Sequence, residues 1–99
     1  MVQVDIYTTR YCPYCIAAKQ LLSEKKVAFT EIDVGRDPAL RAAMVERAQG
    51  GATVPQIFIG STHVGGCGDL YALEDAGELD PLLAGPDTPA QPANERPSA

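Results

Sequence analysis

Cys12-Pro13-Tyr14-Cys15 stands between a strand-like run, Val2 to Tyr7, and a helix-like run that begins at Pro13. Two thiols with this spacing, at the junction of a strand and a helix, are the pattern of a redox site. An inert structural disulfide, or half of a zinc site, is the alternative for such a pair. The strand-then-helix context favours the redox interpretation.

The two cysteines differ in their positions on the predicted helix. Cys12 falls at the N-cap, where free backbone N–H groups and the positive end of the helix dipole stabilise a thiolate. Pro13 fits the first helical position, because its missing N–H is not needed there. Cys15 lies on the face that Ala18 and Leu22 continue, so its side chain should point inward. We therefore expect Cys12 to be the nucleophile and Cys15 the resolving thiol, which attacks a mixed disulfide on Cys12.

Composition restricts the class of protein. The chain has 99 residues, 45% of them hydrophobic, which is enough for one domain with one core. A net charge of −5 and scattered basic residues argue against a nucleic-acid surface. No apolar run has the length of a membrane span, and Met1 to Arg10 lacks the apolar run of a signal peptide. We expect a cytoplasmic monomer that binds neither nucleic acid nor a membrane, and a cysteine pair that is catalytic rather than structural.

The middle of the chain predicts a second strand and a second helix. Val27 to Val34 is rich in β-branched and aromatic residues, as strands are. Asp37-Pro38 starts a helix, since the aspartate can cap it and the proline suits its first position. The stripe expected to face the core consists of Leu40, Met44 and Ala48.

The second half predicts a hairpin followed by a helix. Gln56 to Ile59 is the third strand, and the turn Gly60-Ser61 should return the chain antiparallel as Thr62 to Val64. A last helix starts near Cys67 and stops at Gly77, and Asp80-Pro81 starts one more short turn. The fold class is therefore α/β, a βαβ unit followed by ββα.

Domain boundaries follow from a change in composition at Gly85. Residues 1–84 form the predicted domain, whereas residues 85–99 carry several prolines among small and polar residues. Such a segment cannot build a core, so we expect residues 85–99 to be a disordered tail.

Three motifs in this order resemble the dithiol glutaredoxins. They are Cys12-Pro13-Tyr14-Cys15, Thr53-Val54-Pro55-Gln56 before the third strand, and Gly65-Gly66-Cys67-Gly68-Asp69 before the last helix. The resemblance covers Val2 to Leu83. It implies a thioredoxin fold with a four-stranded mixed sheet flanked by helices. It also implies a glutathione-dependent oxidoreductase that reduces protein disulfides and glutathione mixed disulfides, with no tightly bound cofactor.

The resemblance further implies a glutathione site. Pro55 would follow a cis peptide bond, which frees the N–H and C=O of Val54 to pair with the glutathionyl cysteine, and Thr53 flanks that edge. Backbone N–H groups at the start of the last helix would bind the γ-glutamyl carboxylate, and Asp69 would accept from its ammonium. The residues offering those N–H groups are Gly66, Cys67 and Gly68, and the side chains completing the groove are Tyr14 and Gln56.

One position departs from the family pattern. Many glutaredoxins carry a lysine shortly before the first active-site cysteine, whereas this chain has Thr8-Thr9-Arg10-Tyr11. Arg10 is the candidate for charge assistance, although its position is offset by one residue. Lys19, four residues after Cys15, is interpreted as a solvated surface lysine.

Two other functions remain open at this level. Cys12, Cys15, Cys67 and His63 together would supply ligands for zinc or an iron–sulfur cluster, which would make the chain a carrier rather than an enzyme. Taken singly, Cys67 is expected to be a small buried hydrophobe and His63 an exposed strand residue. The second alternative is a thioredoxin-like reductase coupled to a flavoprotein reductase; Tyr14 and the glycine-rich turn favour glutathione over it.

Overall fold

The computed structural model describes residues 2–84, so the predicted tail, residues 85–99, lies outside the described residues. The elements, in chain order, are β1 (Val4–Thr8), α1 (Pro13–Glu24), β2 (Thr30–Asp33), α2 (Pro38–Arg47), β3 (Gln56–Ile59), β4 (Thr62–Gly65), α3 (Cys67–Asp75) and α4 (Leu79–Ala84). No helix among these residues is long and apolar enough to cross a membrane.

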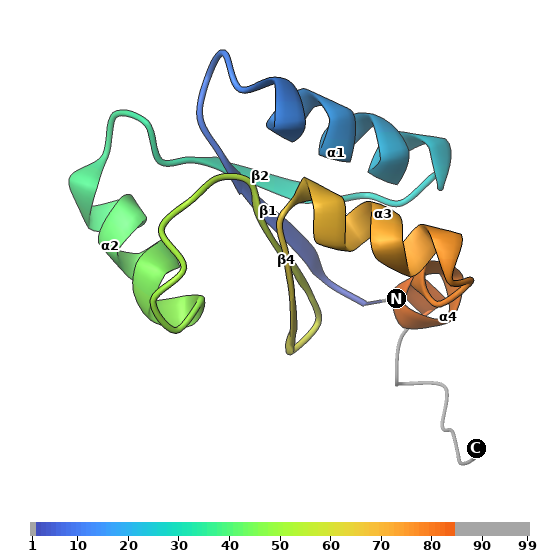
Figure 1. The fold of residues 1–99 in the computed structure, drawn as a ribbon. Helices are drawn as coiled ribbons and strands as arrows, with labels where there is room; N and C mark the ends of the chain where they lie inside the picture. Colours follow the sequence, from blue (N-terminus) through green and yellow to red (C-terminus); the bar gives the residue numbers. More distant parts are fainter. Residues whose placement is uncertain (1, 85–99) are drawn as a thin grey trace.

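The strands form one mixed sheet in the order β2-β1-β3-β4. β1 pairs parallel with β2 and antiparallel with β3, and β3 pairs antiparallel with β4. The predicted order, βαβ followed by ββα, is confirmed. β1 is paired on both sides and leads through a short loop into α1, so the cysteine motif follows a strand that is held in place by two neighbours (Figure 1).

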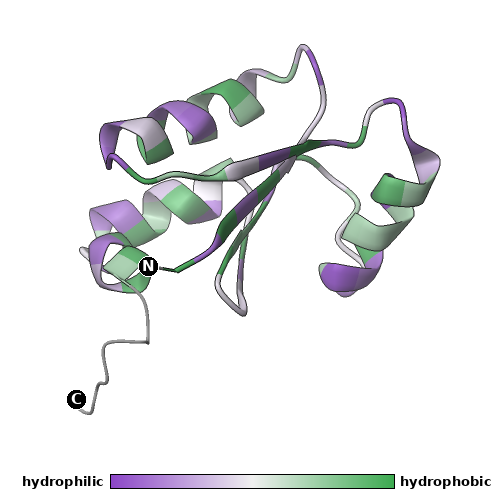
Figure 2. Cartoon of the chain, turned by 180° about the vertical axis from the view of Figure 1, so that it is seen from behind, coloured by the Kyte–Doolittle hydropathy of each residue, from purple (hydrophilic) through white to green (hydrophobic). Residues whose placement is uncertain are grey.

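Helices cover both faces of the sheet. α1 and α3 lie on one face, and α2 lies on the other (Figure 1). Alternate residues of the central strands therefore enter two clusters, and hydrophobic and hydrophilic residues alternate around the helices (Figure 2). The first cluster contains Val4, Ile6, Ala18, Leu21, Leu22, Ile57, Ile59, Leu70, Leu79 and Leu83. The second contains Tyr7, Val34, Met44, Ala48 and Phe58.

Local capping sets the starts of α1 and α2. Cys12 is the N-cap of α1, and its sulfur accepts a hydrogen bond from the Cys15 backbone N–H at 3.3 Å. Asp37 caps α2, where its carboxylate accepts from the N–H groups of Ala39 at 3.0 Å and Leu40 at 3.1 Å. Both helices have proline at the start, as predicted.

α2 differs from its predicted packing. Leu40 was expected in the buried stripe, but it is 39% exposed, which corrects that prediction. Met44 and Ala48 are buried as expected, so only the C-terminal half of α2 reaches the sheet. Leu40 is one turn too early to make that contact.

Several boundaries also differ. The second strand begins at Thr30 instead of Val27, because Val27 and Phe29 pack against the first cluster outside the sheet ladder. The first strand is displaced to Val4–Thr8, and the short turn predicted at Asp80-Pro81 is the helix α4.

Candidate active site

Cys12 lies between two backbone groups from different elements. Its half-buried sulfur accepts from the Cys15 N–H at 3.3 Å. Its thiol also donates a long hydrogen bond to the carbonyl oxygen of Val54, with 3.9 Å between sulfur and oxygen. The start of α1 and the loop before β3 therefore meet at the Cys12 sulfur. This is the position expected of a nucleophilic cysteine.

Cys15 has the opposite environment. Its side chain is 1% exposed. Burial, followed by its hydrogen bond with Cys12, raises the pKa of the Cys15 thiol to about 12. The thiol is therefore almost entirely protonated near neutral pH. The structure places the two thiols as predicted, one at the surface and one sealed behind it.

The loop before β3 passes beside Cys12. The Val54–Pro55 peptide bond is cis, as the family resemblance implied. Thr53 is exposed and Val54 is half-buried, and the Val54 carbonyl faces the Cys12 sulfur. Gln56 is only 5% exposed, and its side chain is engaged within the fold. Its amide nitrogen donates to Thr53 Oγ1 at 3.3 Å.

The turn before α3 lies against the same loop. A Cβ on Gly66 would be 3.6 Å from the carbonyl oxygen of Pro55, so the two segments are neighbours. Gly65 has φ of +111°, and a Cβ there would collide with the carboxylate of Asp69. That carboxylate already accepts from the Gly66 N–H at 2.9 Å. The start of α3 is thereby fixed beside the cis bond, with Gly68 and Asp69 exposed.

Cys67 is half-buried and packs at the edge of the first cluster, so it is less enclosed than predicted. Burial and then the neighbouring Cys12 raise the pKa of its thiol. Tyr14, on the other side of the cysteine motif, is 68% exposed.

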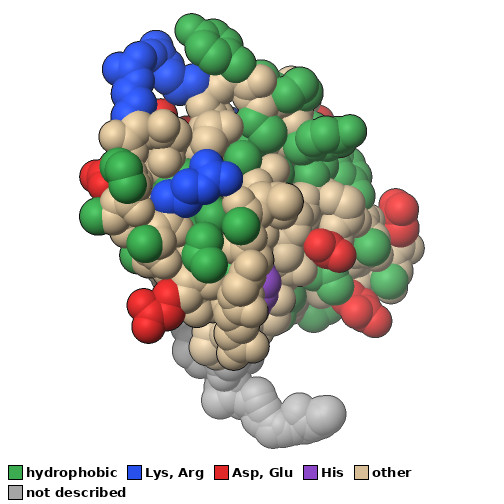
Figure 3. All heavy atoms as spheres, turned by 60° about the vertical axis from the view of Figure 1, so that its left-hand side comes forward, with side chains coloured by type: hydrophobic (Ala, Val, Ile, Leu, Met, Phe, Trp, Pro, Cys, Tyr) green, Lys and Arg blue, Asp and Glu red, His purple; other side chains and the backbone are tan. Residues whose placement is uncertain are grey.

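Two shallow grooves flank the loop between β1 and α1. One, of about 420 Å³, has a basic lining that includes Arg10, Arg36 and Arg41. Arg41 also donates to the carbonyl oxygen of Ala52 at 2.8 Å, which ties α2 to the loop before Thr53. Figure 3 shows basic side chains in the upper half of this side of the molecule and acidic ones mainly near its edges.

The other groove, of about 350 Å³, was not predicted. Its lining includes Cys15, Lys19 and Glu31. Lys19 is in an ion pair with Glu31 at 2.9 Å, which corrects its interpretation as a solvated lysine. The i to i+4 spacing from Cys15 was the available signal, but the partner on β2 could not be found from spacing.

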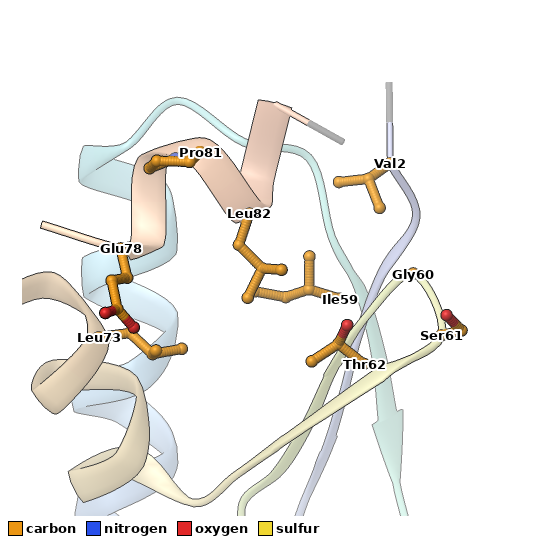
Figure 4. A pocket seen from close by; sticks show the side chains of 9 residues that line it. All are labelled: Val2, Ile59, Gly60, Ser61, Thr62, Leu73, Glu78, Pro81 and Leu82. Atoms are coloured by element: carbon orange, nitrogen blue, oxygen red, sulfur yellow. The ribbon is translucent and has the colours of Figure 1, made fainter. Parts of the chain in front are cut away.

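A third hollow, of about 570 Å³, lies between the β3–β4 turn and α4 (Figure 4). Val2, Leu73 and Leu82 are among its lining residues, and none of the cysteines is. Its volume therefore has no bearing on the redox chemistry.

The geometry does not assemble the alternative metal site. Within residues 2–84, no three His, Cys, Asp or Glu side chains are grouped so that they could hold a metal ion. His63 is exposed, as expected, and is engaged elsewhere. Its Nε2 is 2.6 Å from Gln56 Oε1, and its ring stacks on Phe58 with 4.7 Å between centroids.

Comparisons with known proteins agree with one another. The glutaredoxin family model matches residues 4–64. A glutaredoxin of Pseudomonas aeruginosa is 61% identical over 84 residues, which cover 85% of this chain and 99% of the relative. Glutaredoxin 3 of Escherichia coli K12 is 54% identical over 83 residues, covering 84% and 99% of the two chains.

Solved structures give the same picture. The solution structure of a glutaredoxin from Brucella melitensis matches with a TM-score of 0.74 and 63% identity, covering 84% of this chain and 89% of that one. A buckwheat glutaredoxin–glutathione complex matches with a TM-score of 0.76 and 29% identity, covering 84% and 77%.

Proposed function

Since this chain belongs to the glutaredoxin family, has the thioredoxin fold and is a thiol-disulfide oxidoreductase, we propose that glutathione is its reductant. Its substrates are proteins that carry a disulfide or a glutathione mixed disulfide. These reactions would take place in the cytoplasm. The observation that carries the proposal is the position of Cys12 Sγ, between the first turn of α1 and the Val54 carbonyl.

The first reaction uses one cysteine. The Cys12 thiolate attacks the glutathione sulfur of a mixed disulfide, the sulfur–sulfur bond breaks, and the substrate leaves as a thiolate that takes up a proton. Cys12 then carries glutathione. A second glutathione thiolate attacks this adduct, forms oxidised glutathione and restores the Cys12 thiolate.

The segments around Cys12 support glutathione as the ligand. The half-buried backbone of Val54 would pair with the backbone of the glutathionyl cysteine, and the exposed Thr53 lies beside it. The Gly66 N–H already donates to Asp69, so the N–H groups left for a carboxylate at the start of α3 are those of Cys67 and Gly68. Asp69 suits an ammonium. Tyr14 and Arg10 are both exposed, as side chains available to a bound glutathione would be.

The second reaction uses both cysteines. Attack of Cys12 on a protein disulfide leaves the partner protein bound through a mixed disulfide. The Cys15 sulfur then attacks the Cys12 sulfur, which forms a disulfide between Cys12 and Cys15 and releases the partner as a thiol. Two glutathione molecules return the pair to the reduced state, with oxidised glutathione as the product.

Single-cysteine variants test this division. Cys12→Ser should abolish both reactions, whereas Cys15→Ser should retain reduction of glutathione mixed disulfides and lose mainly the reduction of protein disulfides. Mass spectrometry should find the glutathione adduct of the Cys15→Ser variant on Cys12. A Cys15→Ser variant that is inactive on mixed disulfides, or an adduct on Cys67, would contradict the assigned roles.

The choice of reductant needs its own measurement. In a coupled assay, glutathione with glutathione reductase should support turnover, and thioredoxin reductase should not. Turnover with thioredoxin reductase alone would establish the thioredoxin-like alternative. The absorption spectrum of anaerobically purified protein separates both from a cluster carrier, which would absorb in the visible range.

A further inference from the structure

The dithiol reaction requires Cys15 to become a thiolate in a place that disfavours charge. Its thiol pKa of about 12 leaves little thiolate near neutral pH. The two groups that lower this pKa are the Thr9 backbone, through a hydrogen bond, and the Lys19 ammonium, through its charge. Of these, only Lys19 acts through a side chain that can be replaced.

Lys19 lines the same groove as the buried Cys15. It follows Cys15 by one turn of α1, where residues four apart share a face. Both side chains line the groove of about 350 Å³. The Lys19 side chain is 31% exposed, so its charge is only partly screened by water. An ammonium in this position attracts negative charge that develops on the Cys15 sulfur.

Two residues of the sheet hold Lys19 in place. Its Nζ is 2.9 Å from Glu31 Oε2, and the Thr8 hydroxyl donates to the same oxygen at 2.8 Å. Thr8 is buried in the central strand β1, which fixes that hydroxyl. Lys19, with a smaller effect from Thr8, lowers the pKa of the Glu31 carboxyl. A carboxylate with a lowered pKa is a poor proton acceptor, so Glu31 holds Lys19 rather than acting as the base.

We propose that Lys19, held by Glu31 and Thr8, is a positioning residue for the dithiol reaction, in which it stabilises the Cys15 thiolate during attack on the Cys12 mixed disulfide. The proposal rests on the dithiol branch of the proposed function. In this step the Cys15–Cys12 bond forms and the bond from Cys12 to the partner sulfur breaks. The Cys15 proton leaves through the groove to solvent, and the departing partner thiolate takes up a proton there.

Other charged groups face the same groove. They are Arg10 from the loop before α1, and Glu31 and Asp33 from β2. Cys12 lies at the N-cap of α1, and Cys67 at the start of α3 lies on the Cys12 side. Replacing Lys19 with glutamine also removes the ion-pair partner of Glu31, whereas Lys19→Arg retains a positive charge beside that carboxylate.

The test mixes the reduced protein with one equivalent of the symmetrical disulfide of thionitrobenzoate in a stopped-flow instrument. The attacks by Cys12 and by Cys15 then appear as two separate phases. Cys12 attack releases the first thionitrobenzoate, and Cys15 attack on the resulting mixed disulfide releases the second; both are coloured. Every variant is made in a Cys67→Ser background, so that only two thiols react. Because the reagent replaces glutathione and protein substrates, the measurement is independent of which reductant the chain uses.

Lys19→Gln should slow the second phase about threefold near neutral pH, because a smaller fraction of Cys15 is thiolate, and the higher nucleophilicity of that thiolate offsets only part of the loss. The first phase should change less. The logarithm of the second-phase rate should rise with pH along parallel lines for Lys19→Gln and its parent, with the Lys19→Gln line lower. The difference between the two rates should shrink at high salt, which screens the Lys19 charge. Lys19→Arg keeps the charge and should restore the rate.

Lys26→Gln is the matched control, since it removes the same charge from an exposed position just beyond α1. A second phase in Lys19→Gln within twofold of the parent would overturn the proposal. So would equal slowing by Lys26→Gln, no rescue by Lys19→Arg, or a difference that salt does not reduce. If Lys19→Gln fails to fold, slowing of the second phase by high salt in the parent tests the same charge effect, and an unchanged rate rejects it.

Discussion

Burial of Cys15 should make the reduced protein sensitive to alkaline pH. The thiol has an ordinary pKa of about 9.0 in the unfolded chain and about 12 in the folded protein. Below the lower value both states hold the proton, and the stability of the fold is unaffected. Above it the unfolded chain releases the proton while the folded protein retains it, so the free energy of unfolding falls until the pH reaches the folded pKa.

The size of the loss follows from these two values. Each unit of pKa difference corresponds to about 1.4 kcal/mol, so the full effect is about 4 kcal/mol. At about pH 10.5 the unfolded thiol is almost fully ionised and the folded thiol is not. The expected loss at that pH is about 2 kcal/mol.

Comparison with Cys15→Ala isolates this effect. Urea unfolding of both proteins is followed by circular dichroism with a phosphine reductant at about pH 8 and about pH 10.5. Lysine and tyrosine ionisation affect both proteins, and the cavity left by the substitution costs the same at each pH, so the difference between the proteins reports Cys15. Between about pH 8 and about pH 10.5, the free energy of unfolding of the wild type should fall by about 2 kcal/mol more than that of Cys15→Ala. Equal differences at the two pH values would show that the Cys15 pKa is not raised.

Three other substitutions or deletions have defined expectations. Leu22→Ala removes a fully buried side chain of the first cluster and should lower the free energy of unfolding by about 3 kcal/mol in urea titrations. Arg47→Ala removes an ion pair with Asp5 at 2.9 Å and a guanidinium 4.0 Å from the centre of the Phe58 ring. It should lower the free energy of unfolding by about 2 kcal/mol. Arg36→Ala, at an exposed site, should lower it by less than about 0.5 kcal/mol. Deleting residues 85–99 should leave the melting temperature within about 2 °C and the activity unchanged, since that composition buries little apolar area; a larger loss in calorimetry would show that the segment packs against the domain.

Local signals account for what the sequence predicted well. The cap at Cys12 and the proline after it involve neighbouring residues only, so the start of α1 could be read directly. The same holds for Asp37-Pro38 and for the turn at Gly60-Ser61. Burial of Cys15 followed from its spacing to Ala18 and Leu22, because the period of a helix fixes which residues share a face.

Contacts between elements account for what the sequence did not predict. Leu40 has the spacing of a core residue, but whether it is buried depends on where α2 crosses the sheet. Lys19 pairs with Glu31 across α1 and β2, and the helical pattern contains no information about that strand. Gln56 was predicted to complete the glutathione groove, but its side chain is hydrogen-bonded to His63, because two antiparallel strands bring them together.

The uneven packing of the helices has a consequence for hydrogen exchange. α1 buries Cys15, Ala18, Leu21 and Leu22, whereas α2 buries only Met44 along its length. Segments with few buried apolar contacts open at a lower free energy than the whole domain. Amide protons of α2 should therefore exchange through local opening, whereas those of α1 and the central strands should exchange only through global unfolding.

This opening reaches the active site through Arg41. Its hydrogen bond to the Ala52 carbonyl ties α2 to the loop before Val54, so a loosened α2 also loosens that loop. A ligand that pairs with the Val54 backbone would hold the loop and, with it, α2. Slower amide exchange in a helix that does not touch the ligand would then report occupancy of the site from the opposite face of the sheet.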